Sequence, residues 1–416
     1  MKKVRLGIFG LNRGGTFIPH FLANDADIVA VCDKSEKWMN WRKEKLGKDV
    51  ACYEDFDEFL KHPMDAVFIA NYFHEHASYA IKCLEKDIHV LCECTSNATM
   101  AEGVALVRAA EKSKAIYMLA ENYPYMNFNR EIKRVCDGGT LGDILYGEGE
   151  YNHPGNPYSD SGVLTLFDSE KHWRCYLPKT YYVTHALAPL MFATGATPKK
   201  VTAFPIKVPM PKDSIKANYA GGDNSAIMMT QNDDGSVFRF TGCAALGAHH
   251  VSHRVCGRFG SIENVRGGEG KVMLRYNEWN IPEGMEEVNY YLPDMQDKDA
   301  ELIKKANHDG GDFIVAREFI NCVRENKPHP FDVYFATTMA SVAILAHRGI
   351  LEGGKTYDIP DFRKEEDRIK YENDHDTPFY HSDGRVPTIP CCSDSDYKPS
   401  EYQQEKFTEI LDRERK

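Results

Sequence analysis

The amino-acid sequence predicts an α/β fold in which a doubly wound parallel sheet is followed by an α/β domain built on a large, mostly antiparallel open sheet. Three observations lead to this prediction. Within the first 120 residues, short apolar runs alternate with amphipathic helical segments, which is typical of a sheet covered by helices on both faces. After about residue 123 the runs become longer and alternate apolar with polar residues. Helical periodicity returns in 311–326 and 332–354.

The parallel sheet is predicted from five buried runs, four of which are followed by a helical segment. The expected strands span 4–10, 27–33, 65–71, 88–93 and 115–121, and the expected helices span 15–23, 38–47, 76–87 and 99–113. Continuous runs of Val, Ile and Leu are typical of parallel strands, because both faces of such a sheet are covered. We therefore expect these strands to form one layer between two layers of helices.

The second sheet is predicted from the longer alternating runs. The expected strands span 143–152, 199–208, 224–232, 236–245, 253–265, 271–277 and 286–293. Turn residues at 233–236 are typical of a connection between antiparallel neighbours. The stretch 152–180 is rich in turn residues, and we expect it to be an active-site loop.

The chain is long for a single domain, so we predict two domains and an extension. Residues 1–122 form the N-terminal domain, 123–360 form the substrate and catalytic domain, and 361–416 form a polar C-terminal extension. We expect the extension to wrap on the body or on a neighbouring subunit, and partial disorder near its end is the alternative.

Composition limits the partners and the compartment. The net charge of -11 argues against nucleic acid and against an anionic membrane surface. No window approaches 18 uninterrupted apolar residues, so we expect no membrane span. The twelve cysteines show no spacing typical of a structural zinc site, and the start of the chain does not have the pattern of a signal peptide. A cytoplasmic protein with reduced thiols is the simplest interpretation.

A glycine-rich turn follows the first expected strand and opens the first helix. Gly10, Asn12, Arg13, Gly14 and Gly15 belong to a G-x-G-x-x-G pattern in which Asn takes the middle position. The glycines of this pattern allow a tight turn and a close approach of backbone to a pyrophosphate at the helix N-terminus. Asn tolerates left-handed backbone angles better than other non-glycine residues, so it is a reasonable replacement there.

Asp33 ends the second expected strand, where an acidic side chain binds ribose hydroxyls and repels a 2′-phosphate. This position favours NAD over NADP. A glycine-rich turn alone is more often only a turn, but here strand, turn, helix, strand and acid follow in the expected order. The sequence therefore predicts an NAD-binding Rossmann domain.

By these features the chain resembles the glucose-fructose oxidoreductase/inositol dehydrogenase family (Gfo/Idh/MocA). The segment 65–93 is similar to the signature of that family, with His76 at a helix start and Glu93 at a strand end, and 257–263 is similar to its C-terminal sheet turn. The resemblance implies a C-terminal open-sheet domain that covers the nicotinamide and through which the chain forms a homo-oligomer. In dehydrogenases of the family a catalytic lysine follows that Glu, whereas this chain has Cys94, which cannot replace an ammonium group.

A second resemblance is to glycoside hydrolase family 109 and related NAD-dependent glycosidases, which also lack that lysine. The similar segments are "ENYPYMNFNR" (121–130), "GEGEYNHP" (147–154), "HWR" (172–174), "YVTH" (182–185), "HDGGDF" (308–313) and "DVYFAT" (332–337). This chain departs from the family pattern at Val183, where the family has Pro, at Pro154, where it has Asp, and in its C-terminal extension. These departures bear on the substrate more than on the reaction class.

The resemblance implies a glycoside cleavage without net oxidation. Bound NAD would take a hydride from C3 of the sugar, a side-chain base would remove the acidified C2 proton, and elimination, water addition and re-reduction would follow. Such a cycle needs several acid/base groups around one sugar ring rather than two carboxylates across a glycosidic bond. The candidate catalytic residues are Tyr182, His185, Tyr151, His153 and Glu121. We expect His185 to act at the C3 hydroxyl and Tyr182 at C2.

The resemblance also implies two sets of ligand contacts. The expected cofactor-binding residues are Gly10, Asn12, Arg13, Gly14, Gly15, Asp33, Asn71, His74, His76, Glu93, Cys94, Asn122, Trp173, Arg174 and Tyr182. The expected contacts to a small carbohydrate substrate are Glu121, Tyr151, His153, Arg174, Tyr182, His185, His249 and His308.

The same residues have simpler interpretations. A tyrosine on an apolar helix face, such as Tyr182, is commonly a core residue whose hydroxyl bonds a backbone carbonyl. Glu121 could be a solvated loop acid. Strand spacing places His249 and His253 on one face and His250 on the other, and without an acid at ligand spacing we predict no metal.

Two other functions are compatible with NAD binding, a sugar or cyclitol dehydrogenase of the same superfamily and a non-catalytic regulatory protein.

Overall fold

The computed structural model describes residues 3–46, 49–159, 167–294 and 296–414. The chain forms two compact units, each assembled from three separate stretches. The first unit comprises Met1–Asp137, Tyr291–Ala340 and Pro360–Asp374, and the second comprises Gly138–Tyr290, Ser341–Ile359 and His375–Lys416. The three-domain division at residues 122 and 360 stays a prediction. The first compact unit has residues on both sides of each limit, and the second has residues on both sides of residue 360.

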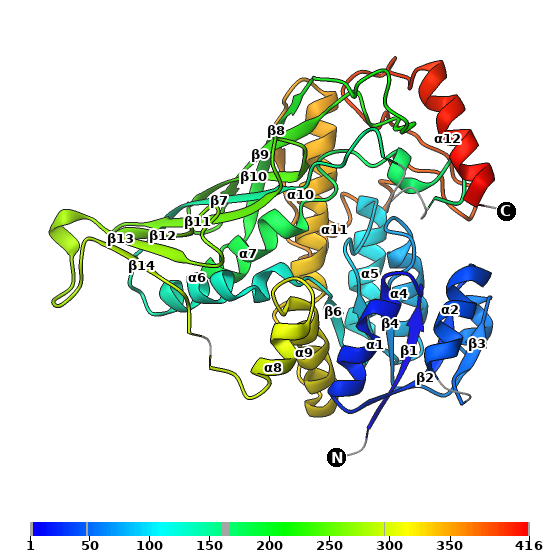
Figure 1. Cartoon of the computed structure of the whole chain (residues 1–416), viewed down its shortest axis with the longest axis horizontal. Helices are drawn as coiled ribbons and strands as arrows, with labels where there is room; N and C mark the ends of the chain where they lie inside the picture. Colours follow the sequence, from blue (N-terminus) through cyan, green and yellow to red (C-terminus); the bar gives the residue numbers. More distant parts are fainter. Residues whose placement is uncertain (1–2, 47–48, 160–166, 295, 415–416) are drawn as a thin grey trace. The chain divides into compact units, whose positions relative to one another are not determined.

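The first unit is built on a six-stranded parallel sheet in the order β3-β2-β1-β4-β5-β6 (Figure 1). Its strands are β1 (Val4–Phe9), β2 (Ala26–Cys32), β3 (Ala51–Tyr53), β4 (Ala66–Ile69), β5 (His89–Cys92) and β6 (Tyr117–Leu119). All four residues of β4 are buried, as the continuous apolar run predicts for a strand covered on both faces. The predicted doubly wound parallel sheet is confirmed.

Helices connect and flank these strands. They are α1 (Gly14–Ala23), α2 (Glu36–Leu46), α3 (Phe56–Phe59), α4 (His76–Leu84), α5 (Met100–Lys112), α6 (Asn127–Asp137), α8 (Ala300–Lys305), α9 (Gly311–Glu325) and α11 (Glu365–Arg368). Helix α5 begins at a capping box in which Thr99 and Glu102 satisfy each other's backbone N–H groups. Helix α10 (Val333–Leu351) contributes residues to both units.

The second unit contains a nine-stranded sheet in the order β14-β13-β12-β11-β7-β10-β9-β8-β15 (Figure 1). Its strands are β7 (Ile144–Asn152), β8 (Pro198–Ile206), β9 (Ser225–Asn232), β10 (Val237–Ala244), β11 (His250–Gly257), β12 (Gly260–Asn264), β13 (Val272–Tyr276), β14 (Val288–Tyr291) and β15 (Tyr357–Asp358). Of the pairs with a described register, β7 with β10 is parallel and the other pairs are antiparallel. This agrees with the prediction of a mostly antiparallel sheet.

One face of this sheet carries helix α7 (Thr184–Thr194), which packs on β7, β10 and β11.

The C-terminal extension packs on the chain body: Phe379 and Cys392 are buried, and helix α12 (Glu401–Glu414) ends the described chain. Residues 160–166 of the loop predicted at 152–180 lie outside the described residues. Within the described chain, no helix has the length and apolar character needed to cross a membrane.

Candidate active site

The glycine-rich turn of the first unit joins β1 to α1. Gly10 has a φ of 91°, and a Cβ there would lie 2.3 Å from the carbonyl oxygen of Ala70, so only glycine allows β1 and β4 to end this close together. A Cβ on Gly14 would lie 2.7 Å from Ile8, which explains the glycine at the helix start. Asn12 is not among the described residues with positive φ. The middle position therefore needs no left-handed backbone here, and tolerance of that conformation is not why Asn fits.

Asp33 lies beside this turn, directly after β2. Its carboxylate accepts hydrogen bonds from the backbone N–H of Leu11 at 2.6 Å and of Ser35 at 2.7 Å. Burial raises the pKa of this carboxyl, while the two N–H groups oppose the shift. The acid is thus held at the first turn of the nucleotide-binding pattern, where ribose hydroxyls are bound in Rossmann domains.

Arg13 of the same turn lies in a partly buried ion network around the buried Asp312 carboxylate. Its guanidinium donates to Glu93 at 2.7 Å and to both oxygens of Asp312, at 3.0 and 3.1 Å, and it stacks 4.6 Å from the ring centroid of Phe17. These contacts, with a hydrogen bond from His308, hold the pKa of Asp312 well below its usual range although burial opposes this. The network joins the glycine turn to the end of β5 and to the start of α9.

Asp312 is a residue that sequence reasoning missed as a site residue. It also accepts a hydrogen bond from the Asn122 side chain at 2.6 Å and lies 3.1 Å from His308 Nδ1. Asp312 is part of the "HDGGDF" segment. An acidic residue at the start of an apolar helical run was the sequence feature that could have identified it as a buried, partnered carboxylate. His308, predicted to contact substrate, therefore lies in the ion network of the first unit.

The Cys94 and Glu121 side chains meet at the carboxyl ends of β5 and β6. The Cys94 thiol donates to Glu121 Oε2 at 3.1 Å, and the backbone N–H of Tyr123 donates to Oε1 at 3.1 Å. Glu121 is fully buried, so the interpretation as a solvated loop acid is wrong. Cys94 thus contacts a buried acid at the position where the resemblance to the dehydrogenases implies a lysine.

The remaining predicted cofactor residues of this unit follow β4. His76 is buried, with Nδ1 at 2.7 Å from the Thr95 carbonyl and Nε2 at 3.3 Å from that of Asn71, and burial lowers its pKa. His74 is also buried. The Oδ1 atoms of Asn71 and Asn122 are buried acceptors that bond no described residue. Hydroxyl and amide donors of a dinucleotide would satisfy them, so the residues fit NAD.

In the second unit, Tyr151 and His185 are brought together by two glycines. Strand β7 reads Gly147-Glu-Gly149-Glu-Tyr151, and both glycines lie on the face covered by α7. A Cβ on Gly149 would lie 2.1 Å from the Ala186 carbonyl oxygen, and one on Gly147 would lie 2.7 Å from Phe238. Because these positions lack side chains, the first turn of α7 rests directly on the strand.

The aromatic cluster that results consists of Tyr151, His153, Tyr182, His185 and His249. The His185 ring lies edge to face with Tyr151 at 4.9 Å and with Tyr182 at 5.1 Å between centroids, and Tyr151 is stacked on His153 at 5.6 Å. Tyr151 and His185 are buried, whereas His153 is exposed. Helix α7 begins at Thr184, so Tyr182 lies just before the N-terminus of the helix and is not part of it.

The three histidines near β11 separate as strand spacing predicts. His249 Nδ1 lies 2.9 Å from His153 Nδ1, so one nitrogen donates and the other accepts. His253 is buried and donates from Nε2 to the His185 carbonyl at 3.1 Å, which supports the α7 start. His250 lies 2.8 Å from Glu150 on the opposite face. No group of three or more His, Cys, Asp or Glu side chains in the described chain could hold a metal ion.

Arg174 belongs to the same unit, in the short 3-10 helix η3 (Trp173–Cys175). Its guanidinium lies 4.3 Å from the centroid of the Trp173 ring. Burial lowers the pKa of Arg174, and the neighbouring Tyr182, Cys243 and Tyr151 raise it. An arginine remains charged in proteins, so this cation favours ionisation of the nearby phenols.

Comparison with known proteins agrees with both halves of this description. Residues 4–121 match the model of the oxidoreductase family with an NAD-binding Rossmann fold, and residues 190–368 match the glycosyl hydrolase 109 C-terminal domain. Curated relatives named glycosyl hydrolase family 109 protein come from Saccharopolyspora erythraea (25% identity, 87% of this chain and 83% of the relative) and Streptomyces niveus (28% identity, 87% and 78%).

Solved structures share the fold at low identity. A levoglucosan dehydrogenase in complex with NADH and L-sorbose superposes with a TM-score of 0.69 and 16% identity, over 87% of this chain and all of that one. An Agrobacterium radiobacter oxidoreductase in complex with NAD+, L-tartaric acid and magnesium gives 0.70 and 16%, over 86% and 99%.

The parallel sheet and its glycine turn thus define an NAD-binding protein of the Rossmann class. Residues 4–121 match the Gfo/Idh/MocA oxidoreductase family, and residues 190–368 match the C-terminal domain of the glycosyl hydrolase 109 proteins, the name that the curated relatives carry.

Proposed function

We propose that the protein is an NAD-dependent glycosidase that cleaves its substrate without net oxidation. The observation that carries this proposal is the Tyr151, Tyr182 and His185 cluster, in which the rings of two phenols and an imidazole contact one another. It is supported by Cys94, a thiol at the position of the dehydrogenase lysine, and by the relatives' family. We further propose that Gly10, Asp33, Asn71 and Asn122 hold the cofactor.

The cofactor supplies a hydride acceptor and donor for C3 of the sugar. The side chains supply the proton transfers. His185 takes the proton of the C3 hydroxyl, because a neutral imidazole nitrogen can act as a general base towards a hydroxyl group. Tyr182 then removes the C2 proton, which a C3 carbonyl makes acidic, and the Arg174 cation stabilises its phenolate. The His153 and His249 pair passes protons onward through its short N–H···N contact.

The test is a screen of aryl α- and β-glycosides with added NAD in D₂O. We expect aglycone release, deuterium at C2 of the product sugar and no net NADH. Net NADH formation on free sugars would instead identify a dehydrogenase. NAD binding with neither cleavage nor C2 exchange would identify a non-catalytic binding protein.

Two variants test the residue roles in the same assay. Tyr182→Phe should lower C2 exchange by at least about 10²-fold, the usual effect of removing a general base. Tyr146→Phe is the matched control, because Tyr146 contacts Glu148 on the opposite face of β7. Equal rates in the two variants would exclude Tyr182 as the base.

We also propose that the protein is a cytoplasmic homo-oligomer that associates through the open face of the nine-stranded sheet. That face exposes Phe204 and Met229 among charged residues such as Arg239. Met229→Glu should lower the mass measured by light scattering if the proposal holds, and an unchanged mass would place the interface elsewhere.

A further inference from the structure

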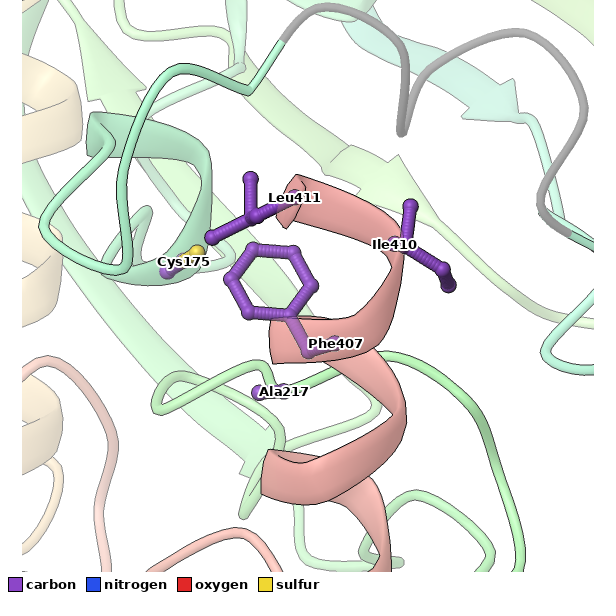
Figure 2. Packing of buried hydrophobic residues seen from close by; sticks show 5 residues of the cluster. All are labelled: Cys175, Ala217, Phe407, Ile410 and Leu411. Carbon is purple, nitrogen blue, oxygen red and sulfur yellow. The ribbon is translucent and has the colours of Figure 1, made fainter. Parts of the chain in front are cut away.

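Helix α12 at the end of the extension buries an apolar face against the second unit. Phe407, Ile410 and Leu411 are 2%, 7% and 3% exposed and pack with Cys175 and Ala217 in one cluster (Figure 2). Cys175 is the last residue of η3, the short helix that carries Arg174. The extension therefore contacts the short helix that carries Arg174.

A second line of contacts runs from α12 to the start of η3. The Phe407 ring meets Phe167 edge to face at 5.4 Å between centroids, and Phe167 packs on His172 at 4.7 Å. His172 is the N-cap of η3, where its Nδ1 accepts a hydrogen bond from the backbone N–H of Arg174 at 3.3 Å. Phe407 is thus linked to the start of η3 through Phe167 and His172, and it shares a cluster with Cys175 at the other end.

His172 can perform this capping role at neutral pH. Burial lowers its pKa to about 4, so the ring is neutral and Nδ1 remains an acceptor. The other end of η3 is tied by the Cys175 carbonyl, which accepts hydrogen bonds from the N–H groups of Tyr219 at 2.8 Å and Ala220 at 3.2 Å. Ala217, just before these residues, lies in the α12 cluster.

We propose that α12 is a positioning element that fixes the two ends of η3, and with them the Arg174 that η3 carries, with Phe407 as its central residue. The idea deepens the proposed function and rests on it. The family models match residues 4–121 and 190–368, so neither the helix nor the segment that it supports falls within a matched region. The proposed support of η3 by α12 therefore joins two segments that both lie outside the regions that the two family models match.

The first test compares Phe407→Ala with Tyr402→Ala by amide hydrogen exchange. Tyr402 is on the same helix but is 45% exposed and outside the cluster. We expect exchange of the Arg174, Cys175 and Tyr176 amides to rise at least tenfold in Phe407→Ala and to stay unchanged in Tyr402→Ala. Equal exchange in both variants would overturn the proposal. Phe407→Leu, which keeps an apolar side chain, should restore most of the protection and provides the comparison if Phe407→Ala does not fold.

The second test follows C2 deuteration. In Phe407→Ala we expect kcat to fall about tenfold and the pH of half-maximal rate to rise by about one unit, because the phenolate loses a cation. The Kd for NAD should not change. A rate loss without a shift of the pH profile would mean that α12 only stabilises the fold. If the wild-type protein shows no C2 exchange, the proposed function is wrong. The amide hydrogen-exchange comparison of Phe407→Ala with Tyr402→Ala then still tests whether α12 holds η3.

Discussion

The His185 imidazole meets the Tyr151 ring almost perpendicularly, with an interplanar angle of 84° and 4.9 Å between the ring centroids. One residue lies in the first turn of α7 and the other near the end of β7. The contact exists because Gly149 lets the Ala186 carbonyl reach the strand. A helix start and a strand end thereby form one aromatic cluster.

Gly149→Ala tests this dependence. The added Cβ would lie 2.1 Å from the Ala186 oxygen, so α7 must move off the sheet. We expect a loss of about 1–3 kcal/mol in the free energy of unfolding, measured with denaturant, and a lower rate of C2 exchange. Gly155→Ala is the control, because its Cβ would meet only Lys216 Nζ, at 3.4 Å. Equal stability of the two variants would contradict the packing argument.

Asp33→Asn tests the nucleotide turn. The carboxylate is held by two backbone N–H groups beside the turn, and an amide is a weaker partner for ribose hydroxyls. We expect the Kd for NAD, measured by calorimetry, to rise by about 10- to 100-fold, since hydrogen bonds to charged groups contribute roughly 1.5–3 kcal/mol. The preference for NAD over NADP should also shrink. Asp27→Asn, an exposed partner of Lys3, should change neither value.

Asp312→Asn tests the buried ion network. The change removes the negative charge that both Arg13 and His308 contact, and it leaves Arg13 with Glu93 alone as its ion partner among the network residues. Breaking a buried pair by removing one partner costs about 3–5 kcal/mol, so the melting temperature should fall by several degrees. Asp309→Asn is the control, because Asp309 makes an exposed contact to the Asn127 N–H. A melting temperature like that of the control would show that the network adds little stability.

His347→Gln tests the acid sensitivity of the second unit. His347 is buried and donates from Nε2 to the Pro390 carbonyl at 2.7 Å, and burial lowers its pKa to about 4. Because the unfolded pKa is about 6.5, the unfolded chain binds the proton first. This contribution to stability is complete above pH 6.5 and is lost as the pH falls towards 4, for a total on the order of 3 kcal/mol.

The glutamine variant keeps an N–H donor for Pro390 but does not titrate. We therefore expect the melting temperature to fall less steeply between pH 7 and 4.5 than in the wild-type protein. His375→Gln, at an exposed position, should retain the wild-type slope. Parallel slopes in all three proteins would exclude His347 as a source of acid sensitivity.

Much of the fold could be predicted because its signals are local. Continuous apolar runs indicated β1, β4 and β5, and alternating runs indicated the second sheet. The turn at Gly10 and the acid at Asp33 occur in sequence order, so spacing was enough to find them. The parallel pairing of β7 with β10 has no such local mark, because it depends on which distant strands meet.

The residues that were missed or misinterpreted share one property, which is dependence on distant partners. Asp312 was overlooked because its partner Arg13 lies 299 positions away in the sequence. Glu121 was left open as a solvated acid because the Cys94 thiol and the Tyr123 N–H that surround it come together only in the folded sheet. The extension was recognised as an extension, but no pattern linked Phe407 to η3.

The sequence by itself determined the Rossmann sheet, the cofactor turn and the identity of the groups available for proton transfer, because strand periodicity, glycine spacing and side-chain chemistry are local properties of the chain. The tertiary structure decided which of those groups touch. The Tyr151 and His185 rings meet, His308 joins Arg13 through Asp312, and the last helix packs on Cys175. Such contacts arise from packing between residues far apart in the chain, and packing depends on the whole fold rather than on any one segment.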